Sequence, residues 1–166
     1  GKFMGLFNKK EKVTFCKFLV VDGCIPGMSS PSLVKISLLP DQMEIRQITG
    51  GKNIAYLSYT QINNAQKINE EEITEANKSS IGRAVVGGVL LGPLGAMVGG
   101  MSGIGKKKKT KYKDYFVVNY TSSTDESSVI SFEITGATVG FSKFLFELKQ
   151  NSNIVDPPVQ EGPTFL

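Results

Sequence analysis

A run of lysines is the strongest concentration of chemically capable side chains in this sequence. It consists of Lys106, Lys107, Lys108, Lys109, Lys111 and Lys113. Ammonium groups this close together attract phosphate groups, either those of anionic lipids or those of nucleic acids. The rings of Tyr112 and Tyr115 can stack on bases, as in single-strand binding proteins. A flank that is only solvated is a third interpretation, and the run alone leaves all three open.

A second chemical pattern overlaps the start of the lysine run. Residues Gly100 to Lys106 have the spacing G-x-x-x-x-G-K of a phosphate-binding loop. Lys107 stands where such a loop needs Ser or Thr to ligate magnesium, and a glycine-rich stretch precedes it where a buried strand is required. We therefore expect no nucleotide site here.

The rest of the composition offers little to catalysis. There is no histidine, and Cys16 and Cys24 are the only cysteines. His-based triads and His-containing zinc sites are excluded, and two separate cysteines do not make a structural zinc site alone. We expect reduced thiols, no metal, no cofactor and no enzymatic activity.

The stretch before the lysines is glycine-rich and uncharged. Residues 80–113 hold nine of the eighteen glycines, and residues 84–105 contain no charged side chain. Small residues recur at every fourth position: Ala84, Gly88, Gly92, Ala96 and Gly100 form one row, and Gly95, Gly99 and Gly103 form another. Such rows let helix backbones approach closely, so this stretch is the candidate surface for self-association or membrane contact.

Pro93 divides this stretch, because proline inside a helix removes a hydrogen bond and disfavours helix at the preceding residue. A break there leaves two arms, each containing a Gly-Gly step, at residues 87–88 and 99–100. We favour a helical hairpin or kinked pair whose halves pack through their glycines. A single membrane-spanning helix and an irregular glycine-rich loop remain alternatives.

The surrounding chain is typical of a small β-rich domain. β-branched and aromatic residues predict strands over residues 13–22, 33–39, 43–48, 54–59, 114–121 and 129–135, with a further short strand within 62–68. Residues 70–78 form either a short helix or a charged strand. The spacing of Phe141, Phe144, Leu145 and Leu148 predicts an amphipathic helix. Six phenylalanines at these spacings are expected in the core: Phe15, Phe18, Phe116, Phe132, Phe144 and Phe146.

The predicted elements divide the chain into three segments. Residues 1–12 are expected to be a flexible N-terminal segment, residues 13–150 the domain with its insert at 80–113, and residues 151–166 an extended or disordered tail. The net charge is +4, and much of the positive charge is concentrated in the lysine run after the insert, whereas Glu70, Glu71, Glu72 and Glu75 precede the insert.

In the order of its elements, six or seven antiparallel strands and then one helix, the chain resembles the bacterial and prophage PH-like or GRAM-like proteins of unknown role that carry a glycine-rich insert. The residues that carry the resemblance are Asp22-Gly23, Ile25-Pro26, Pro40-Asp41 with Ile45, Leu57 to Tyr59, Ile62, Phe132, the Phe141 to Leu148 helix and the insert itself. The resemblance implies a β-barrel plugged by the last helix and used for binding. Residues 24–32 contain no Lys or Arg, unlike the corresponding loop of phosphoinositide-binding PH domains.

The sequence therefore predicts a non-enzymatic PH-like module that self-associates or docks on a membrane through its insert and lysine run. The expected partners are a second copy, an anionic membrane or a protein, with nucleic acid the least favoured. The expected location is the cytoplasm, at the membrane surface or inserted in it. An adaptor that binds a protein segment in the barrel groove is the alternative, and a nucleotide-binding protein is a distant third.

Overall fold

The computed structural model describes residues 12–23, 25–28, 31–79, 85–102 and 112–154, with the side chains of 78, 79 and 99–102 left aside. The first elements are β1 (Thr14–Asp22), β2 (Ser32–Leu38), β3 (Gln42–Gln47), β4 (Ile54–Ser58), the 3-10 helix η1 (Tyr59–Gln61), β5 (Ile62–Asn69) and α2 (Glu70–Ser79). The insert contains β6 (Val85–Val86), β7 (Val89–Leu90) and α3 (Pro93–Ser102). The chain then continues through β8 (Asp114–Thr121), β9 (Ser127–Ile134) and α4 (Phe141–Asn151).

Seven of the strands form one antiparallel sheet in the order β4-β3-β2-β1-β9-β8-β5. This agrees with the predicted PH-like strand number, but the predicted closed barrel is wrong, because β4 and β5 are the two edges and do not pair with each other. The physical reason lies in η1, where Gln61 accepts from the Ser58 N–H at 3.0 Å and donates to the Thr121 carbonyl at 3.1 Å. These bonds turn the chain toward β8 before β5 begins.

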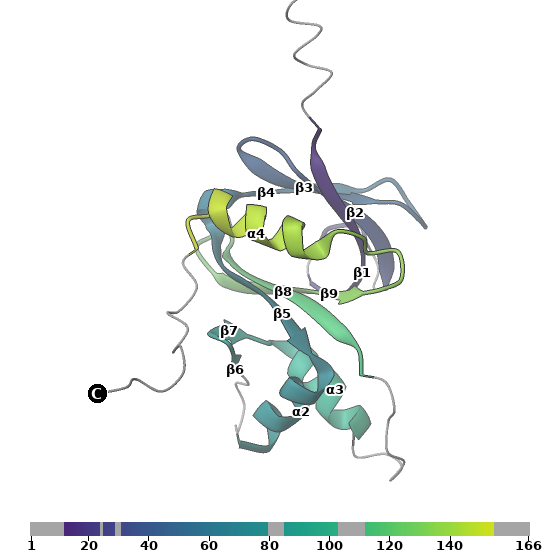
Figure 1. The fold of residues 1–166 in the computed structure, drawn as a ribbon, viewed down its shortest axis with the longest axis vertical. Coiled ribbons are helices and arrows are strands. Elements are labelled where there is room, and N and C mark those ends of the chain that lie inside the picture. Colours follow the sequence, from purple (N-terminus) through teal and green to yellow (C-terminus); the bar gives the residue numbers. More distant parts are fainter. Residues whose placement is uncertain (1–11, 24, 29–30, 80–84, 103–111, 155–166) are drawn as a thin grey trace, which may run out of the picture.

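The main core lies between the curved sheet and α4, which crosses one open side of it (Figure 1). Phe18, Phe116, Phe132 and Phe144 are fully buried, and their ring centroids are 5.2 to 5.8 Å apart where they meet. Leu148 is also fully buried, so the predicted amphipathic helix is confirmed.

Two of the six phenylalanines expected in the core are at the surface. Phe15 is 48% exposed, because strand alternation directs it away from its buried neighbours Cys16 and Phe18, and its ring lies 4.3 Å from the Lys35 ammonium. Phe146 is 64% exposed, because it lies off the stripe by which α4 contacts the sheet. The core expectation was wrong for both.

A second core joins the insert to the opposite face of the sheet. Along β8, Phe116 and Val118 face the main core, whereas Tyr115 and Val117 face the insert. The second cluster is completed by buried side chains from β5, α2, β7, α3 and the link between β7 and α3: Ile68, Ile73, Val89, Leu91, Leu94 and Val98. Figure 1 shows these elements together beside β5 and β8, away from α4. The insert is therefore packed onto the domain over its described residues.

The predicted helical hairpin is wrong for the first arm of the insert, which forms the β6-β7 hairpin. Gly87 and Gly88 have φ of 58° and 82°, the left-handed pair that a tight two-residue turn requires. Pro93 opens α3 at its first position, where a missing N–H costs no helical hydrogen bond. The β6-β7 hairpin also rules out the alternative of a single continuous helix through the insert. Within the described parts of the chain, no helix is long and apolar enough to cross a membrane.

Candidate functional site

The insert is the candidate site, and its base is fixed by residues at the ends of β5 and β8. Asn69 caps α2, because its side chain accepts from the Glu71 N–H at 2.9 Å while Glu72 accepts from the Asn69 N–H at 3.0 Å. The acidic segment is thus a helix, which settles the alternative of a charged strand. Buried Glu70 accepts from the Lys113 N–H at 3.2 Å, and its own N–H donates to the Lys113 carbonyl at 2.8 Å.

The hairpin of the insert is attached to the sheet by Asn119 of β8. Its Oδ1 accepts from the Leu90 N–H at 2.8 Å, and its Nδ2 donates to the Leu90 carbonyl at 2.9 Å. The side chain therefore occupies the place that a neighbouring strand would take beside β7. Asn119 is only 9% exposed, so these two bonds satisfy an amide that would otherwise be costly to bury. The sequence does not reveal this anchor, since an Asn within a strand has no distinctive pattern.

The two predicted glycine rows do not form two matching helical ridges. Gly88 lies in the hairpin turn and Gly92, with φ of 58°, lies just before α3. Gly95 is buried on α3 where α2 packs, and its carbonyl accepts from Nδ2 of Asn77. Ala96 is exposed on α3, and Gly99 and Gly100 belong to the same helix. Ala84 and Gly103 lie outside the described residues.

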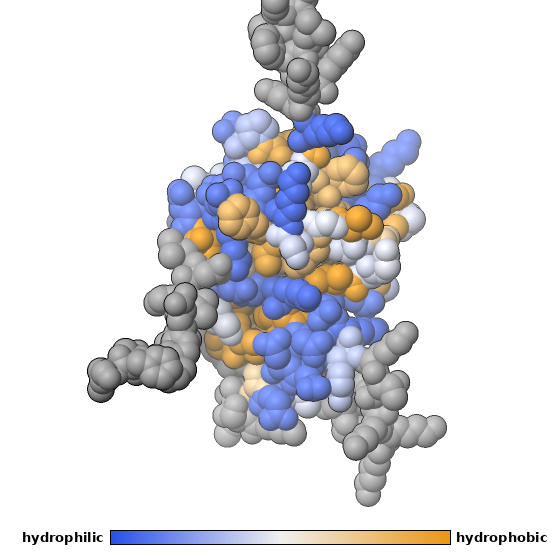
Figure 2. Space-filling view, in the orientation of Figure 1, coloured by the Kyte–Doolittle hydropathy of each residue, from blue (hydrophilic) through white to orange (hydrophobic). Residues whose placement is uncertain are grey.

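The outer face of α3 is apolar although it is at the surface. Gly92, Pro93 and Ala96 are exposed there, and the Met97 side chain is 46% exposed. The helix has no charged residue along its length. We call Gly92, Pro93, Ala96 and Met97 the α3 outer face. Neighbouring α2 is the opposite in character, with Glu71, Glu72 and Glu75 exposed, and Figure 2 shows hydrophilic side chains over α2.

Of the predicted lysine contacts, only Lys113 lies within the described residues. Its Nζ donates to Glu133 Oε1 at 3.3 Å, so part of its charge is balanced within the domain. Lys106, Lys107, Lys108, Lys109 and Lys111 lie outside the described residues. The sequence alone places their five charges shortly after α3.

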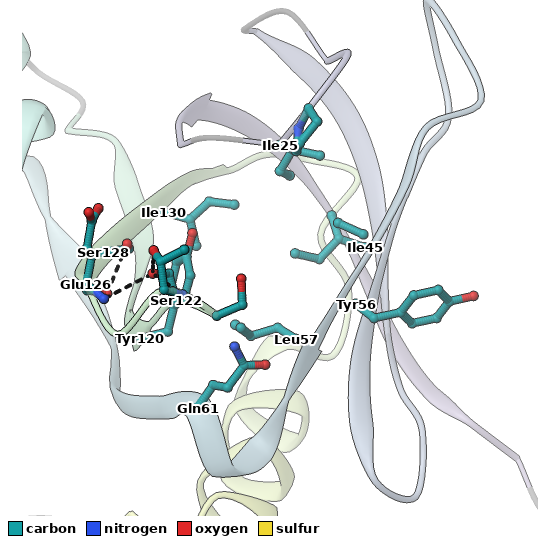
Figure 3. A pocket seen from close by; sticks show the side chains of 14 residues that line it. Ile25, Ile45, Tyr56, Leu57, Gln61, Tyr120, Ser122, Glu126, Ser128 and Ile130 are labelled. Atoms are coloured by element: carbon teal, nitrogen blue, oxygen red, sulfur yellow. Dashed lines mark hydrogen bonds between the residues drawn. The ribbon is translucent and has the colours of Figure 1, made fainter.

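A pocket of about 530 Å³ opens at the end of the sheet formed by the β1-β2 loop, β4 and the β8-β9 turn (Figure 3). Its floor is aliphatic, with Ile25, Ile45, Leu57 and Ile130. Its rim carries hydroxyl groups, which largely stabilise the turn itself, as when Ser122 Oγ accepts from the Glu126 N–H at 3.1 Å. Figure 3 shows the Tyr56 ring directed away from the hollow.

Glu126 is the only charged residue that lines this pocket within the described chain. Head groups of phosphoinositides are recognised by clustered Lys and Arg, because those side chains pair with phosphate oxygens. The described lining offers no such group, which agrees with the absence of Lys and Arg from residues 24–32. The pocket itself was not foreseen, because its walls come from loops far apart in the sequence.

No group of three His, Cys, Asp or Glu residues gathers closely enough within the described chain to hold a metal ion. Burial raises the pKa of the Cys16 thiol to about 11, and its Sγ donates to the Val139 carbonyl at 3.0 Å. Burial, assisted by the charges of Glu70 and Glu133, raises the pKa of Tyr115 to about 12. Both groups are therefore neutral at physiological pH.

Comparison with known proteins gives one match. Residues 28–139 match the family described as "Glycine zipper containing PH domain". The matched region runs from the β1-β2 loop to just before α4 and includes the whole insert. No curated protein and no solved structure matches the chain. PH-like domains are generally non-enzymatic modules. Since the match covers more than half of the chain and the strand order agrees with it, the chain belongs to the family of glycine-zipper-containing PH domains.

Proposed function

We propose that this chain is a non-enzymatic PH-like module that docks on an anionic membrane surface through the α3 outer face and the lysine run. The observation that carries the proposal is the apolar character of a helix face that the fold leaves at the surface. The inner face of α3 is already committed, because Leu94, Gly95 and Val98 are buried against the domain. What remains for a partner is the α3 outer face.

The geometry favours contact in the plane of the interface. A helix of ten residues is about 15 Å long, too short to cross a bilayer but long enough to lie among head groups with its apolar side inward. Each lysine near an anionic surface contributes about 1 kcal/mol, so the run can supply the electrostatic part of the affinity. The affinity of an interfacial helix grows with the apolar area that it buries and with its electrostatic attraction to anionic lipids, and the α3 outer face and the lysine run would supply one each.

Self-association is the second candidate, and the spacing along α3 favours it. Gly92, Ala96 and Gly100 recur at every fourth position, with the first two exposed, so a second helix can approach this side closely. Exposed Glu71, Glu72 and Glu75 on neighbouring α2 would also complement the lysine run of another copy. These carboxylates oppose close approach of α2 to an anionic membrane, so docking must place α3 nearest the lipid.

The experiment compares sedimentation of the full chain with two kinds of vesicle: pure phosphatidylcholine, and phosphatidylcholine with about one-third phosphatidylserine. The chain should sediment with the anionic vesicles only. Replacing Lys106, Lys107, Lys108 and Lys109 with Gln should weaken this binding roughly tenfold or more. Equal recovery with both vesicles, or binding that survives the replacement, contradicts the proposal. Light scattering after size exclusion tests self-association, which a monomer at all concentrations contradicts.

A further inference from the structure

Part of the outer face of the sheet is uncovered. The insert packs on this face over β5, β8 and β9, whereas Figure 1 shows β2, β3 and β4 at the opposite end of the molecule from the insert. Phe15 on β1 is 48% exposed and Tyr56 on β4 is 53% exposed, so no described element covers these rings. Figure 3 shows the Tyr56 ring on the other side of β4 from the pocket. We call this surface the open sheet face, and its residues used below are Phe15, Lys17, Lys35, Glu44, Arg46 and Tyr56.

Three cations lie directly opposite one another across the open sheet face. The strand registers pair Lys17 of β1 with Lys35 of β2, and Lys35 with Arg46 of β3. Like charges directly opposite in a sheet are destabilising, so this cation row is an arrangement that an anionic ligand would relieve. Neighbouring strands are about 4.8 Å apart, so the three side chains leave the sheet along a line about 10 Å long. Such a line is complementary to a chain of repeated negative charges.

Two aromatic rings lie in the next row of the same face. The registers place Phe15 opposite Ser37, Ser37 opposite Glu44, and Glu44 opposite Tyr56, so the rings stand at the two ends of this aromatic row. The aromatic row is two residues, about 7 Å, along the strands from the cation row, and its ends are about 14 Å apart across three strand spacings. The Lys35 ammonium lies 4.3 Å from the centroid of the Phe15 ring. The face therefore presents cations and rings side by side.

Carboxylates neutralise only part of the charge of the cation row. Glu44 is the only carboxylate in the two rows, and its Oε1 accepts from Arg46 Nε at 3.2 Å. Half of the Arg46 side chain is exposed, so this is a surface ion pair of the kind that contributes little to stability. On the neighbouring strand β9, Glu133 already forms an ion pair with Lys113. Lys17 and Lys35 form no ion pair with a described carboxylate.

The two rows favour one class of anionic partner. Single-stranded nucleic acid binds to positively charged surfaces that follow its backbone and to aromatic side chains on which its bases stack. A strand that crosses β1, β2 and β3 can place its phosphates on the cation row while its bases reach the aromatic row. An acidic peptide carries no repeated flat ring to stack, and a second copy would bring the same cations face to face. A bilayer in contact with α3 lies at the other end of the molecule (Figure 1).

From these observations we propose that the open sheet face binds single-stranded nucleic acid. Lys17, Lys35 and Arg46 pair with phosphates, and Phe15 and Tyr56 stack on bases. The sequence makes nucleic acid the least favoured partner of the lysine run, whereas the rows on this face arise from strand register, which local sequence patterns do not reveal. The proposal does not depend on membrane docking, so either proposal can fail without the other.

The test measures fluorescence anisotropy of labelled probes mixed with the full chain. One probe is an oligothymidylate of about ten nucleotides, within the usual size of a single-strand site, and the other is an abasic strand with the same number of phosphates. Tyr56→Ser removes an exposed ring and Tyr56→Phe keeps it. Tyr112→Ser is the matched control, because Tyr112 is 43% exposed beside the lysine run. Lys17→Gln is matched by Lys143→Gln, which changes an exposed lysine on α4.

The oligothymidylate should bind saturably, and Tyr56→Ser should lower its affinity roughly fivefold or more, the contribution of one stacked base. Tyr56→Phe and Tyr112→Ser should leave the affinity unchanged, and the abasic strand should bind the unsubstituted chain more weakly. Lys17→Gln should make the plot of log affinity against log salt concentration less steep by about 0.7, the change for one phosphate contact, and Lys143→Gln should not.

Absence of saturable binding, or equal binding of the two probes, overturns the proposal. Equal effects of Tyr56→Ser and Tyr112→Ser also overturn it, because the nucleic acid then does not select the open sheet face. Three further results would identify another occupant and contradict the proposal. They are a loss of binding to phosphatidylserine-containing vesicles in Tyr56→Ser, a loss of dimer in light scattering by the same variant, and binding of labelled polyglutamate as tight as that of the oligothymidylate and equally weakened by Tyr56→Ser.

Discussion

Replacing Asn119 with Ala tests whether the insert is a structural part of the domain. The substitution removes both bonds to Leu90, of 2.8 and 2.9 Å, and leaves a backbone N–H and C=O without their partner. A typical intramolecular hydrogen bond contributes about 0.5 to 1.5 kcal/mol to stability, so the pair should contribute about 1 to 3 kcal/mol. Leu90 is half-buried, so water can satisfy part of the loss and about 2 kcal/mol is the expected value.

The assay is urea unfolding of the full chain, with hydrogen exchange as a local readout. In thermal unfolding, a loss of about 2 kcal/mol should lower the Tm of a chain of this size by about 4 to 8 °C. In urea, the concentration at half-unfolding should fall while the slope of the unfolding free energy against urea concentration stays constant, because the insert unfolds together with the sheet. Exchange at the Leu90 amide should become faster, since Asn119 Oδ1 is its acceptor.

Asn63→Ala is the matched control, because Asn63 is an exposed residue on β5 whose amide donates one hydrogen bond within the described chain, to the Thr121 hydroxyl at 3.0 Å. It should change the free energy of unfolding by less than about 0.5 kcal/mol. If Asn119→Ala has an effect as small as that of Asn63→Ala, the hairpin is not anchored as described.

Three further changes probe the same architecture. Leu94→Ala, at a position 1% exposed in the second core, should cost about 2 to 5 kcal/mol in urea unfolding; a cost below about 1 kcal/mol would mean that the insert does not share the core. Gly92→Ala should cost about 1 to 2 kcal/mol, because Gly92 has φ of 58° and a Cβ would lie 3.3 Å from Val129. Gly136→Ala, with nothing near, should be neutral in the same assay, and equal effects of the two would argue against strain. For Cys16, the folded pKa of about 11 exceeds the ordinary 9.0, so its contribution to stability is complete below pH 9.0 and is lost as pH rises toward about 11. Cys16→Ala should flatten that part of the stability profile, and an unchanged slope would contradict the assignment.

Local patterns predicted the elements of the main domain well because burial follows chain periodicity there. Cys16, Phe18 and Val20 alternate with more exposed residues along β1, and Phe144 and Leu148 recur at helical spacing along α4. Barrel closure was not predictable in this way. It depends on how η1 directs β5 relative to β4, and that direction comes in part from the long-range bond of Gln61 to the Thr121 carbonyl.

The insert was mispredicted because glycine supports two different roles. Gly87 and Gly88 resemble half of a small-residue helix ridge in the sequence, but their freedom to take positive φ favours a tight turn between Val86 and Val89. The position of Pro93 in an apolar stretch predicts a break within a helix, whereas in the structure Pro93 begins one. The partner of α3 inside the chain, buried Ile73 on charged α2, was a lone apolar residue without a periodic pattern. The exposure of Met97 and the formation of the pocket in Figure 3 likewise depend on tertiary packing, which local sequence patterns do not reveal.

Binding of Met97→Glu to anionic vesicles is the measurement that tests the membrane proposal most directly. Met97 is 46% exposed on the α3 outer face, so a carboxylate there should leave the fold intact while opposing contact with both acyl chains and anionic head groups. Val139→Glu is the control, since Val139 is 76% exposed in the turn before α4, far along the chain from the insert. The account predicts that Met97→Glu lowers the fraction bound to phosphatidylserine-containing vesicles roughly tenfold while Val139→Glu leaves it unchanged. Equal binding by the unsubstituted chain and Met97→Glu would contradict docking through α3.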